Sequence, residues 1–229
     1  SPAFSDLTPD DLATVDVLAI LGTRALNPRA RDLIAAYIRR GGGLLVAAGS
    51  VAIGSLLGAI NGGFVAGLGL PSIVVTLATM VIWRESLRWW REGEFVRGLP
   101  TDFQWFGFGQ DVGQWLVIGI SVLVCGLFAW SLKNLAAGRA VYATGSNPEA
   151  AFLAGIRPKR VVFNVFVWMG GLCGLAAVLH SVRFAAVDPS AGTGMELQVI
   201  AAVVVGGVAI SGGRGTLIGA ALGVLLLTT

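Results

Sequence analysis

The stretch VVFNVFVWMGGLCGLAAVLHSV, residues 161–182, contains no aspartate, glutamate, lysine or arginine. An α-helix needs about 20 mostly apolar residues to cross the hydrocarbon core of a bilayer, so this stretch is long enough for one crossing. Four other stretches also lack these charged residues: 41–83, 112–132, 197–213 and 215–229. Residues 112–132 fit one further crossing, and residues 41–83 are long enough for two. The sequence therefore predicts several transmembrane helices.

The overall composition favours the same class of protein. Of the 229 residues, 55% are hydrophobic and only 13% are charged, which is more apolar than an ordinary soluble domain. A helix pairs its backbone polar groups within its own segment, as a chain surrounded by lipid requires. We therefore predict an all-α polytopic membrane protein, built as a partial helical bundle, with a short N-terminal βαβ-like segment.

Charge and side-chain chemistry argue against several other functions. The formal net charge is +3, but the basic residues are scattered among the loops, so we predict no nucleic-acid binding. His180 is the only histidine, and Cys125 and Cys173 lie inside apolar stretches, where cysteine usually acts as a small hydrophobic residue. We therefore predict no metal site and no catalytic residue.

Residues 1–49 differ in character from residues 50–229, which we expect to form the transmembrane domain. The pattern VDVLAILGTRALNPRARDLIAAYIRRGGGLLVAAG (15–49) reads as a strand at Val15–Leu21, a helix at Asn27–Arg40 and a strand at Leu44–Ala48. It loosely resembles part of an amidotransferase-like or flavodoxin-like α/β domain, and we transfer no function from it. Two alternatives stay open: a genuine extramembrane segment, or an extraneous sequence joined near Gly49.

Basic residues predict the orientation of the helices. Residues 133–160 carry five lysines and arginines against one acidic residue, whereas residues 84–111 carry four arginines against five acidic residues. Cytoplasmic loops are enriched in lysine and arginine, so we expect residues 133–160 on the cytoplasmic side. Residues 112–132 then run inward, and residues 161–182 run outward.

Glycines recur at positions suited to helix packing. Gly54, Gly58 and Gly62 are spaced by four residues, as are Gly215, Gly219 and Gly223, with Gly63/Gly67 and Gly170/Gly174 as single pairs. Spacing by four places them on one helix face, where a second helix can approach closely. The stretch VVVGGVAISGGRG is different, because Gly206, Gly207, Gly212 and Gly213 weaken the helix ahead of Arg214. We expect either a broken or re-entrant segment, which could line a substrate route, or a simple cytoplasmic turn.

Three blocks of sequence resemble the permease subunits of ABC importers for sugars, the ribose-type family related to the branched-chain amino acid permeases. They are INGGFVAGLGLPSIVVTLATMVIWRE (60–85), YATGSNPEAAFLAGIRPKRVVFNVFVWMGGLCGLAAVL (142–179) and DPSAGTGMELQVIAAVVVGGVAISGGRGTLIGAALGVLLL (188–227). The resemblance covers about residues 50–229, in the order and spacing of the family. Helices of that family are missing at both ends, so we expect this chain to be a fragment of a longer permease, truncated after Thr229.

The resemblance implies a subunit of the inner (plasma) membrane that crosses it several times. The family works as a pair of permease subunits, either two copies or two different chains, with two ATP-binding subunits and an extracytoplasmic sugar-binding protein. The segment IWRESLRWWREGEFVRGLPTDFQWFGFG (82–109) most resembles the rhamnose-type branch, which implies a deoxyhexose as the substrate.

The same resemblance implies a cytoplasmic coupling segment, which transmits the movement of the ATP-binding subunits to the membrane. The residues themselves predict the start of a helix here, because Asn147 is a good N-cap, Pro148 suits the first helical position and Glu149 suits the positive end of a helix. The alternative is an ordinary helix in a cytoplasmic loop. The residues implied are Gly145, Asn147, Pro148, Glu149, Ala150, Ala151 and Gly155.

The lysines of the chain bear on the source of energy independently of the resemblance. Lys133 and Lys159 are the only lysines, and neither lies in a G-x-x-x-x-G-K-[ST] phosphate loop. We therefore predict that this chain has no cofactor and no ATPase site of its own, and that ATP binds to partner subunits.

Polar residues in apolar helices are the candidates for the substrate route. These are Asn61, Thr76 and Thr79, together with Gly206, Gly207, Gly212 and Gly213. The simpler interpretation of the first three is hydrogen bonding between helices. Two other functions have requirements of their own. A gradient-driven transporter or channel requires a charged residue within a span, and a membrane-anchored amidotransferase-like enzyme requires a nucleophile before residue 50.

Overall fold

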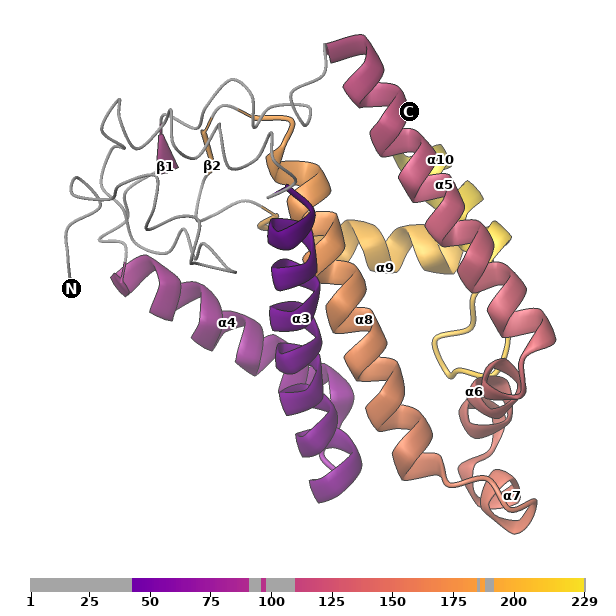
Figure 1. Ribbon diagram of the computed structural model, residues 1–229. Coiled ribbons are helices and arrows are strands. Elements are labelled where there is room, and N and C mark those ends of the chain that lie inside the picture. The colour runs from indigo at the N-terminus through magenta and orange to yellow at the C-terminus, as the bar shows by residue number, and fades with distance from the viewer. Residues whose placement is uncertain (1–42, 91–95, 98–109, 185, 188–191, 229) are drawn as a thin grey trace. The chain divides into compact units, whose positions relative to one another are not determined.

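The computed structural model describes residues 43–90, 96–97, 110–184, 186–187 and 192–228, and almost all of them are helical (Figure 1). In chain order the elements are α3 (Gly43–Gly62), the π-helical turn η3 (Gly63–Gly67), α4 (Ser72–Trp90), β1 (Val96–Arg97), α5 (Gln110–Asn134), α6 (Ala136–Ser146), α7 (Pro148–Leu153), α8 (Pro158–Ser181), β2 (Ala186–Val187), α9 (Met195–Val205) and α10 (Leu217–Thr228). The predicted all-α class is confirmed.

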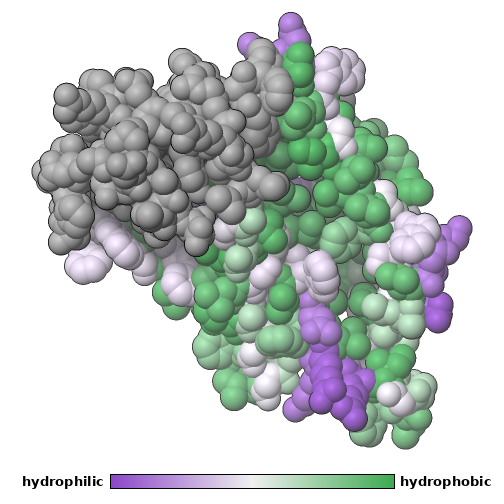
Figure 2. Space-filling model, in the orientation of Figure 1, coloured by the Kyte–Doolittle hydropathy of each residue, from purple (hydrophilic) through white to green (hydrophobic). Residues whose placement is uncertain are grey.

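Three helical segments in the described part of the chain are long and apolar enough to cross a membrane. They are Val46–Gly67, Gln110–Asn134 and Pro158–Ser181. At 1.5 Å per residue, the 24 residues of α8 extend for about 36 Å, more than the thickness of a hydrocarbon core. Apolar side chains cover most of the surface of the described helices, as a protein surrounded by lipid requires (Figure 2). The chain is therefore a multi-pass membrane protein.

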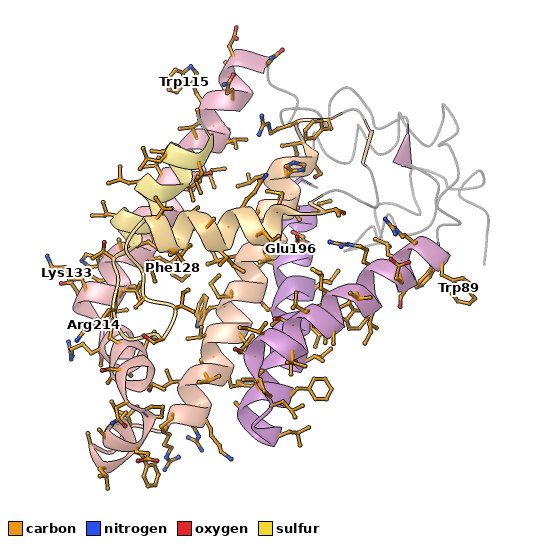
Figure 3. All side chains as sticks on the ribbon, turned by 180° about the vertical axis from the view of Figure 1, so that it is seen from behind. Trp89, Trp115, Phe128, Lys133, Glu196 and Arg214 are labelled. Atoms are coloured by element: carbon orange, nitrogen blue, oxygen red, sulfur yellow. The ribbon has the colours of Figure 1, made fainter. Side chains whose placement is uncertain are left out.

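Residues 41–83 are long enough for two crossings, and α4 forms at the place of the second. The helix forms, but it is not among the three spanning segments. Its last two turns carry Arg84, Glu85 and Arg88, so the apolar part is short. Trp89, at the end of the helix, is 88% exposed and points away from it in Figure 3, as a residue of the membrane–water interface would.

The predicted N-terminal βαβ unit is not supported. The second strand expected at Leu44–Ala48 is wrong, because these residues lie in the first turns of α3. A short apolar run can form a buried strand or a helix, and here it continues directly into an apolar helical stretch. The strand expected at Val15–Leu21 and the helix at Asn27–Arg40 lie outside the described residues. The domain boundary at residue 49 remains a prediction.

Helices α3 and α8 run side by side in the first of two compact units, which also contains α4 (Figure 1). A methyl group on Gly54 would collide with the backbone of Gly170, and one on Gly174 would collide with the backbone of Ser50. A side chain at these positions would force the helices apart, so glycine permits the backbone contact. The predicted packing role of Gly54, Gly58, Gly170 and Gly174 is confirmed.

The second unit contains α6, α7, α9 and α10, together with the adjoining parts of α5 and α8. Helices α9 and α10 pack in antiparallel directions, because Gly206 lies against Gly219 and Ala202 lies against Gly223. Each helix is only 11 or 12 residues long, about 16–18 Å, which is half of a bilayer core. The helix ends at the glycines, as both predicted alternatives require, and the choice between a re-entrant segment and a cytoplasmic turn stays a prediction.

A short antiparallel pair of strands lies in the first unit. Val96 pairs with Val187, and Arg97 pairs with Ala186. The sequence analysis did not predict these strands, because two residues are too few to show an alternating pattern.

Candidate functional site

The segment predicted to couple to a partner forms a short helix with a complete N-terminal cap. The side-chain oxygen of Asn147 accepts hydrogen bonds from the backbone N–H groups of Glu149 and Ala150, each at 3.0 Å. Pro148 occupies the first turn, where a missing N–H costs nothing, and Glu149 places its negative charge at the positive end of the helix. The N-terminal geometry that the sequence predicts is confirmed.

The C-terminus of α7 is closed by Gly155. This residue has a φ of +83°, a left-handed conformation that glycine adopts without steric cost. The N–H of Gly155 donates to the carbonyl of Phe152, and the N–H of Ile156 donates to the carbonyl of Ala151, each at 3.0 Å. These two bonds form a Schellman motif. Both ends of this short helix are therefore fixed by the sequence itself.

The outer face of α7 is apolar and exposed. Phe152 is 65% exposed and Leu153 is 86% exposed, whereas Ala151 is 4% exposed and anchors the helix to its own unit. Glu149 and Ala150 are exposed as well. A rigid, capped helix that presents two large apolar side chains is suited to insertion into a groove of another protein.

Gly145 is separated from the other six predicted coupling residues, because it belongs to α6. A methyl group on Gly145 would lie 2.7 Å from the backbone nitrogen of Gly213. Gly145 therefore contacts the loop between α9 and α10, rather than the surface of α7.

The first unit contains a cavity of about 600 Å³ between α3, α4 and α8. The cavity brings together all three predicted route residues of these helices, Asn61, Thr76 and Thr79. The other lining residues are mainly apolar, and the lining contains no charged side chain: Ser50, Ile53, Gly54, Leu57, Gly58, Met80, Trp83, Phe166, Met169, Gly170, Cys173, Gly174 and Ala177. A mostly apolar cavity of this size with a few polar groups is typical of small-molecule sites.

The three predicted route residues of the cavity differ in their hydrogen bonding. Thr76 Oγ1 donates to the carbonyl of Ser72 and Thr79 Oγ1 donates to that of Val75, both at 2.9 Å and both within α4. The Oδ1 atom of Asn61 is buried and has no hydrogen-bond partner among the described residues. Asn61 is therefore the one of the three predicted route residues whose side-chain oxygen is left unpaired in this structure.

The four glycines of the broken segment have roles in local structure. Gly207 has a φ of +80° and ends α9 with a second Schellman motif, in which its N–H donates to Val204. Gly212 and Gly213 also have positive φ, and Gly206 permits the contact with α10. Arg214 is exposed and points outward from the loop in Figure 3. Whether these glycines line a substrate route remains a prediction.

The sequence analysis did not identify Tyr142 and Thr144 of α6. The hydroxyl of Tyr142 donates a hydrogen bond of 3.0 Å to the carbonyl of Gly215, 73 residues further along the chain. Thr144 is 6% exposed, and its hydroxyl has no partner among the described residues. No local pattern could reveal the role of Tyr142, because its acceptor lies in a distant loop.

Comparison with known proteins identifies the family of such a chain. The family model described as "Branched-chain amino acid transport system / permease component" matches residues 33–229. This match includes α3 to α10 and begins before the first described residue of α3.

Several curated relatives share one description, "Autoinducer 2 import system permease protein LsrC". The protein from Enterobacter sp. (strain 638) is 37% identical over 180 residues, which are 78% of this chain and 52% of that protein. The protein from Salmonella typhimurium (strain LT2) is 35% identical over 176 residues, 77% of this chain and 51% of that protein. The protein from Escherichia coli (strain K12) is 34% identical over 176 residues, 77% of this chain and 52% of that protein.

The chain therefore spans about half the length of the curated relatives it matches. No solved structure matches the chain.

Proposed function

The chain belongs to the family of branched-chain amino acid transport system permease components, and from this premise we propose that it is part of the membrane-spanning permease subunit of an ABC importer. It is a multi-pass protein of the inner membrane. The permease opens alternately to the two sides of the membrane while ATP is hydrolysed on separate subunits. The chain itself performs no covalent chemistry.

The geometry of α7 is the observation that carries this proposal. A transporter driven by a separate ATPase needs a rigid element that transmits movement from the partner. Helix α7 is capped at both ends and presents Phe152 and Leu153 outward. The partner on this face is an ATP-binding subunit, with Glu149, Ala150 and the two apolar side chains at the contact.

The positions of the charges favour this mechanism over a gradient-driven carrier. In α5 the charged residues Asp111 and Lys133 lie in the first and last turns, and in α8 Lys159 and Arg160 lie in the first turn. A proton- or sodium-coupled carrier requires a charged side chain within a span. The uncharged middle of these two helices suits transport that is powered from outside the membrane.

The substrate is a small, neutral, hydroxyl-rich molecule. The uncharged cavity between α3, α4 and α8 would bind a neutral molecule better than an ion. The names of the relatives support autoinducer 2, and the sequence resemblance to the rhamnose-type branch supports a deoxyhexose. The further partners proposed are a second permease subunit and an extracytoplasmic substrate-binding protein.

Co-purification of the full-length protein from membranes tests the proposal. We expect an ATP-binding subunit to accompany the wild-type protein. Glu149→Arg should abolish this association, because it reverses the charge at the contact and opposes the helix dipole. The matched control is Ala137→Arg, which adds an arginine to an exposed position of α6 in the same cytoplasmic segment.

The outcomes separate the two parts of the proposal. Loss of the ATPase from Glu149→Arg but not from Ala137→Arg would support both the ABC mechanism and the contact at α7. If both variants retain the ATP-binding subunit equally, the contact with that subunit lies elsewhere than on α7. Absence of any ATPase from the wild-type preparation would contradict the ABC mechanism itself.

A further inference from the structure

The loop between α9 and α10 is docked on the end of α6, one residue before the cap of α7. Gly212 and Gly213 face Gly145 and Ser146, and a methyl group on Gly213 would lie 2.6 Å from Ser146 Cα. Asn147 follows Ser146 directly and caps α7. The broken membrane segment and the coupling helix are therefore joined by a backbone-to-backbone contact.

One side-chain hydrogen bond fastens this contact. The hydroxyl of Tyr142, one turn before Ser146 on α6, donates to the carbonyl of Gly215 at 3.0 Å. Gly215 immediately precedes Thr216, whose Oγ1 accepts from the N–H of Gly219 and caps the start of α10. A displacement of α6 would therefore act directly on the first turn of α10.

The loop is rigid enough to transmit such a displacement. The N–H of Ala209 donates to the carbonyl of Arg214, and the N–H of Gly212 donates to that of Ala209, each at 3.0 Å. The Schellman motif at Gly207 fixes the other end of the loop to α9. A loop closed by its own hydrogen bonds moves as a unit.

Helix α6 also carries a buried polar group without a partner among the described residues. This group is the hydroxyl of Thr144, and an unpaired buried donor is costly. A different position of the elements around α6 that offered an acceptor to Thr144 would recover this cost.

We propose that Tyr142 is a positioning residue that couples α7 to the broken segment α9–α10, through the contact of Gly145 with Gly212 and Gly213. Movement imposed on α7 passes through α6 to the loop and reaches α10 at Thr216. This inference rests on the proposed function, since it assumes that an ATP-binding subunit moves α7.

Two variants weaken the contact by different means. Tyr142→Phe removes only the hydroxyl that donates to Gly215. Gly145→Ala suits the helix α6, but its new methyl group would lie 2.7 Å from the nitrogen of Gly213 and must displace the loop. Gly126→Ala is the matched control, because a methyl group there has no neighbour within 4 Å.

The experiment uses the full-length permease reconstituted with its ATP-binding subunits in liposomes. Substrate import and ATP hydrolysis are measured together, and hydrogen exchange is followed in peptides from α7 and from residues 206–216, with and without trapping by ATP and vanadate. In the wild type, trapping should change exchange in both peptides. In Tyr142→Phe and Gly145→Ala it should change α7 alone, and substrate imported per ATP should fall about five-fold, the factor for one ordinary hydrogen bond.

The readouts distinguish this inference from the proposed function. Both variants could instead keep wild-type import per ATP and the wild-type change in hydrogen exchange of residues 206–216. This result would overturn the transmitting role of Tyr142 and leave the ABC mechanism intact. Equal loss of ATPase assembly, hydrolysis and import would also overturn it, because Tyr142 would then serve folding alone. Failure of the wild-type protein to bind ATP-binding subunits would contradict the proposed function instead.

Discussion

Asn61 lies near the end of α3, with an amide oxygen that is buried and lacks a partner among the described residues. A buried acceptor without a hydrogen bond destabilises a protein, so its presence in an apolar helix suggests a role beyond packing. Thr76 and Thr79 line the same cavity, but their hydroxyls donate hydrogen bonds to backbone carbonyls of α4. Of the three, Asn61 therefore gives the most direct test of the substrate route.

Asn61→Leu should separate stability from transport. Leucine has the same branched shape and no unpaired oxygen, so the free energy of unfolding of the purified protein should rise by up to about 1–3 kcal/mol. Loss of one ligand hydrogen bond, worth roughly 1 kcal/mol, should raise the apparent KM for transport about five-fold. Thermal unfolding in detergent and uptake into reconstituted vesicles measure the two effects.

Asn164→Leu is the control for Asn61→Leu, because it makes the same change at an exposed position of α8 outside the cavity. Unchanged uptake by Asn61→Leu would remove this residue from the route. A fall in stability would indicate that its amide has a partner in the complete protein.

Single residues were predictable where their role is local. Asn147, Pro148 and Glu149 form an N-terminus because a cap depends only on a few neighbours in sequence. Tyr142 could not be found in this way, because its acceptor belongs to a loop 73 residues away. The unpaired oxygen of Asn61 likewise depends on what surrounds it in space.

Helix α7 has only six residues, too few to be stable alone, so its caps determine whether it forms. Asn147→Ala removes both side-chain hydrogen bonds of the N-cap. We expect the helix to lose about 1 kcal/mol of local stability, and its amides to exchange with solvent about five times faster. Hydrogen exchange measured by mass spectrometry on a peptide covering residues 148–154 tests this.

Asn147→Asp keeps an oxygen in the same place and should leave exchange in α7 close to the wild-type rate. Equal acceleration in both variants would show that the cap does not hold the helix. No change in either would mean that packing around Ala151 suffices.

At the level of elements, long apolar runs were the easiest to predict. Stretches without charged residues predicted the helices α5 and α8, and four closely spaced glycines predicted that the helix would end between α9 and α10. The strand expected at Leu44–Ala48 was wrong because five apolar residues fit either structure, and the tertiary setting of α3 decides. The β1–β2 pair could not be predicted, because two residues in each strand are too few to show an alternating pattern.

For the whole molecule, glycine spacing indicated that helices approach closely but could not say which helices meet. Gly54 and Gly58 contact α8, whereas Gly63 and Gly67 have no neighbour within 4 Å among the described residues, although both pairs have the same spacing. The partner of a packing face depends on the fold, which a single sequence reveals only through its resemblance to a family.

Orientation in the membrane is the property on which the coupling assignment depends. Leu153 lies before α8 and Phe184 lies after it, and about 36 Å of helix separates the two ends. If basic residues keep the segment 133–160 in the cytoplasm, Leu153 is cytoplasmic and Phe184 is on the other side. Cysteines placed at these two positions, in a full-length protein without other cysteines, should therefore react from opposite sides of the membrane.

The measurement is labelling by a membrane-impermeant maleimide in vesicles of both orientations. Leu153→Cys should react only in inverted vesicles, and Phe184→Cys only in right-side-out vesicles; both side chains are exposed, at 86% and 45%, so access is not limited by burial. Uptake activity of the cysteine-free protein confirms that it is folded. The reverse pattern would place α7 on the side without ATP and rule out its contact with an ATPase, whereas reaction of both cysteines from one side would mean that α8 does not cross the membrane.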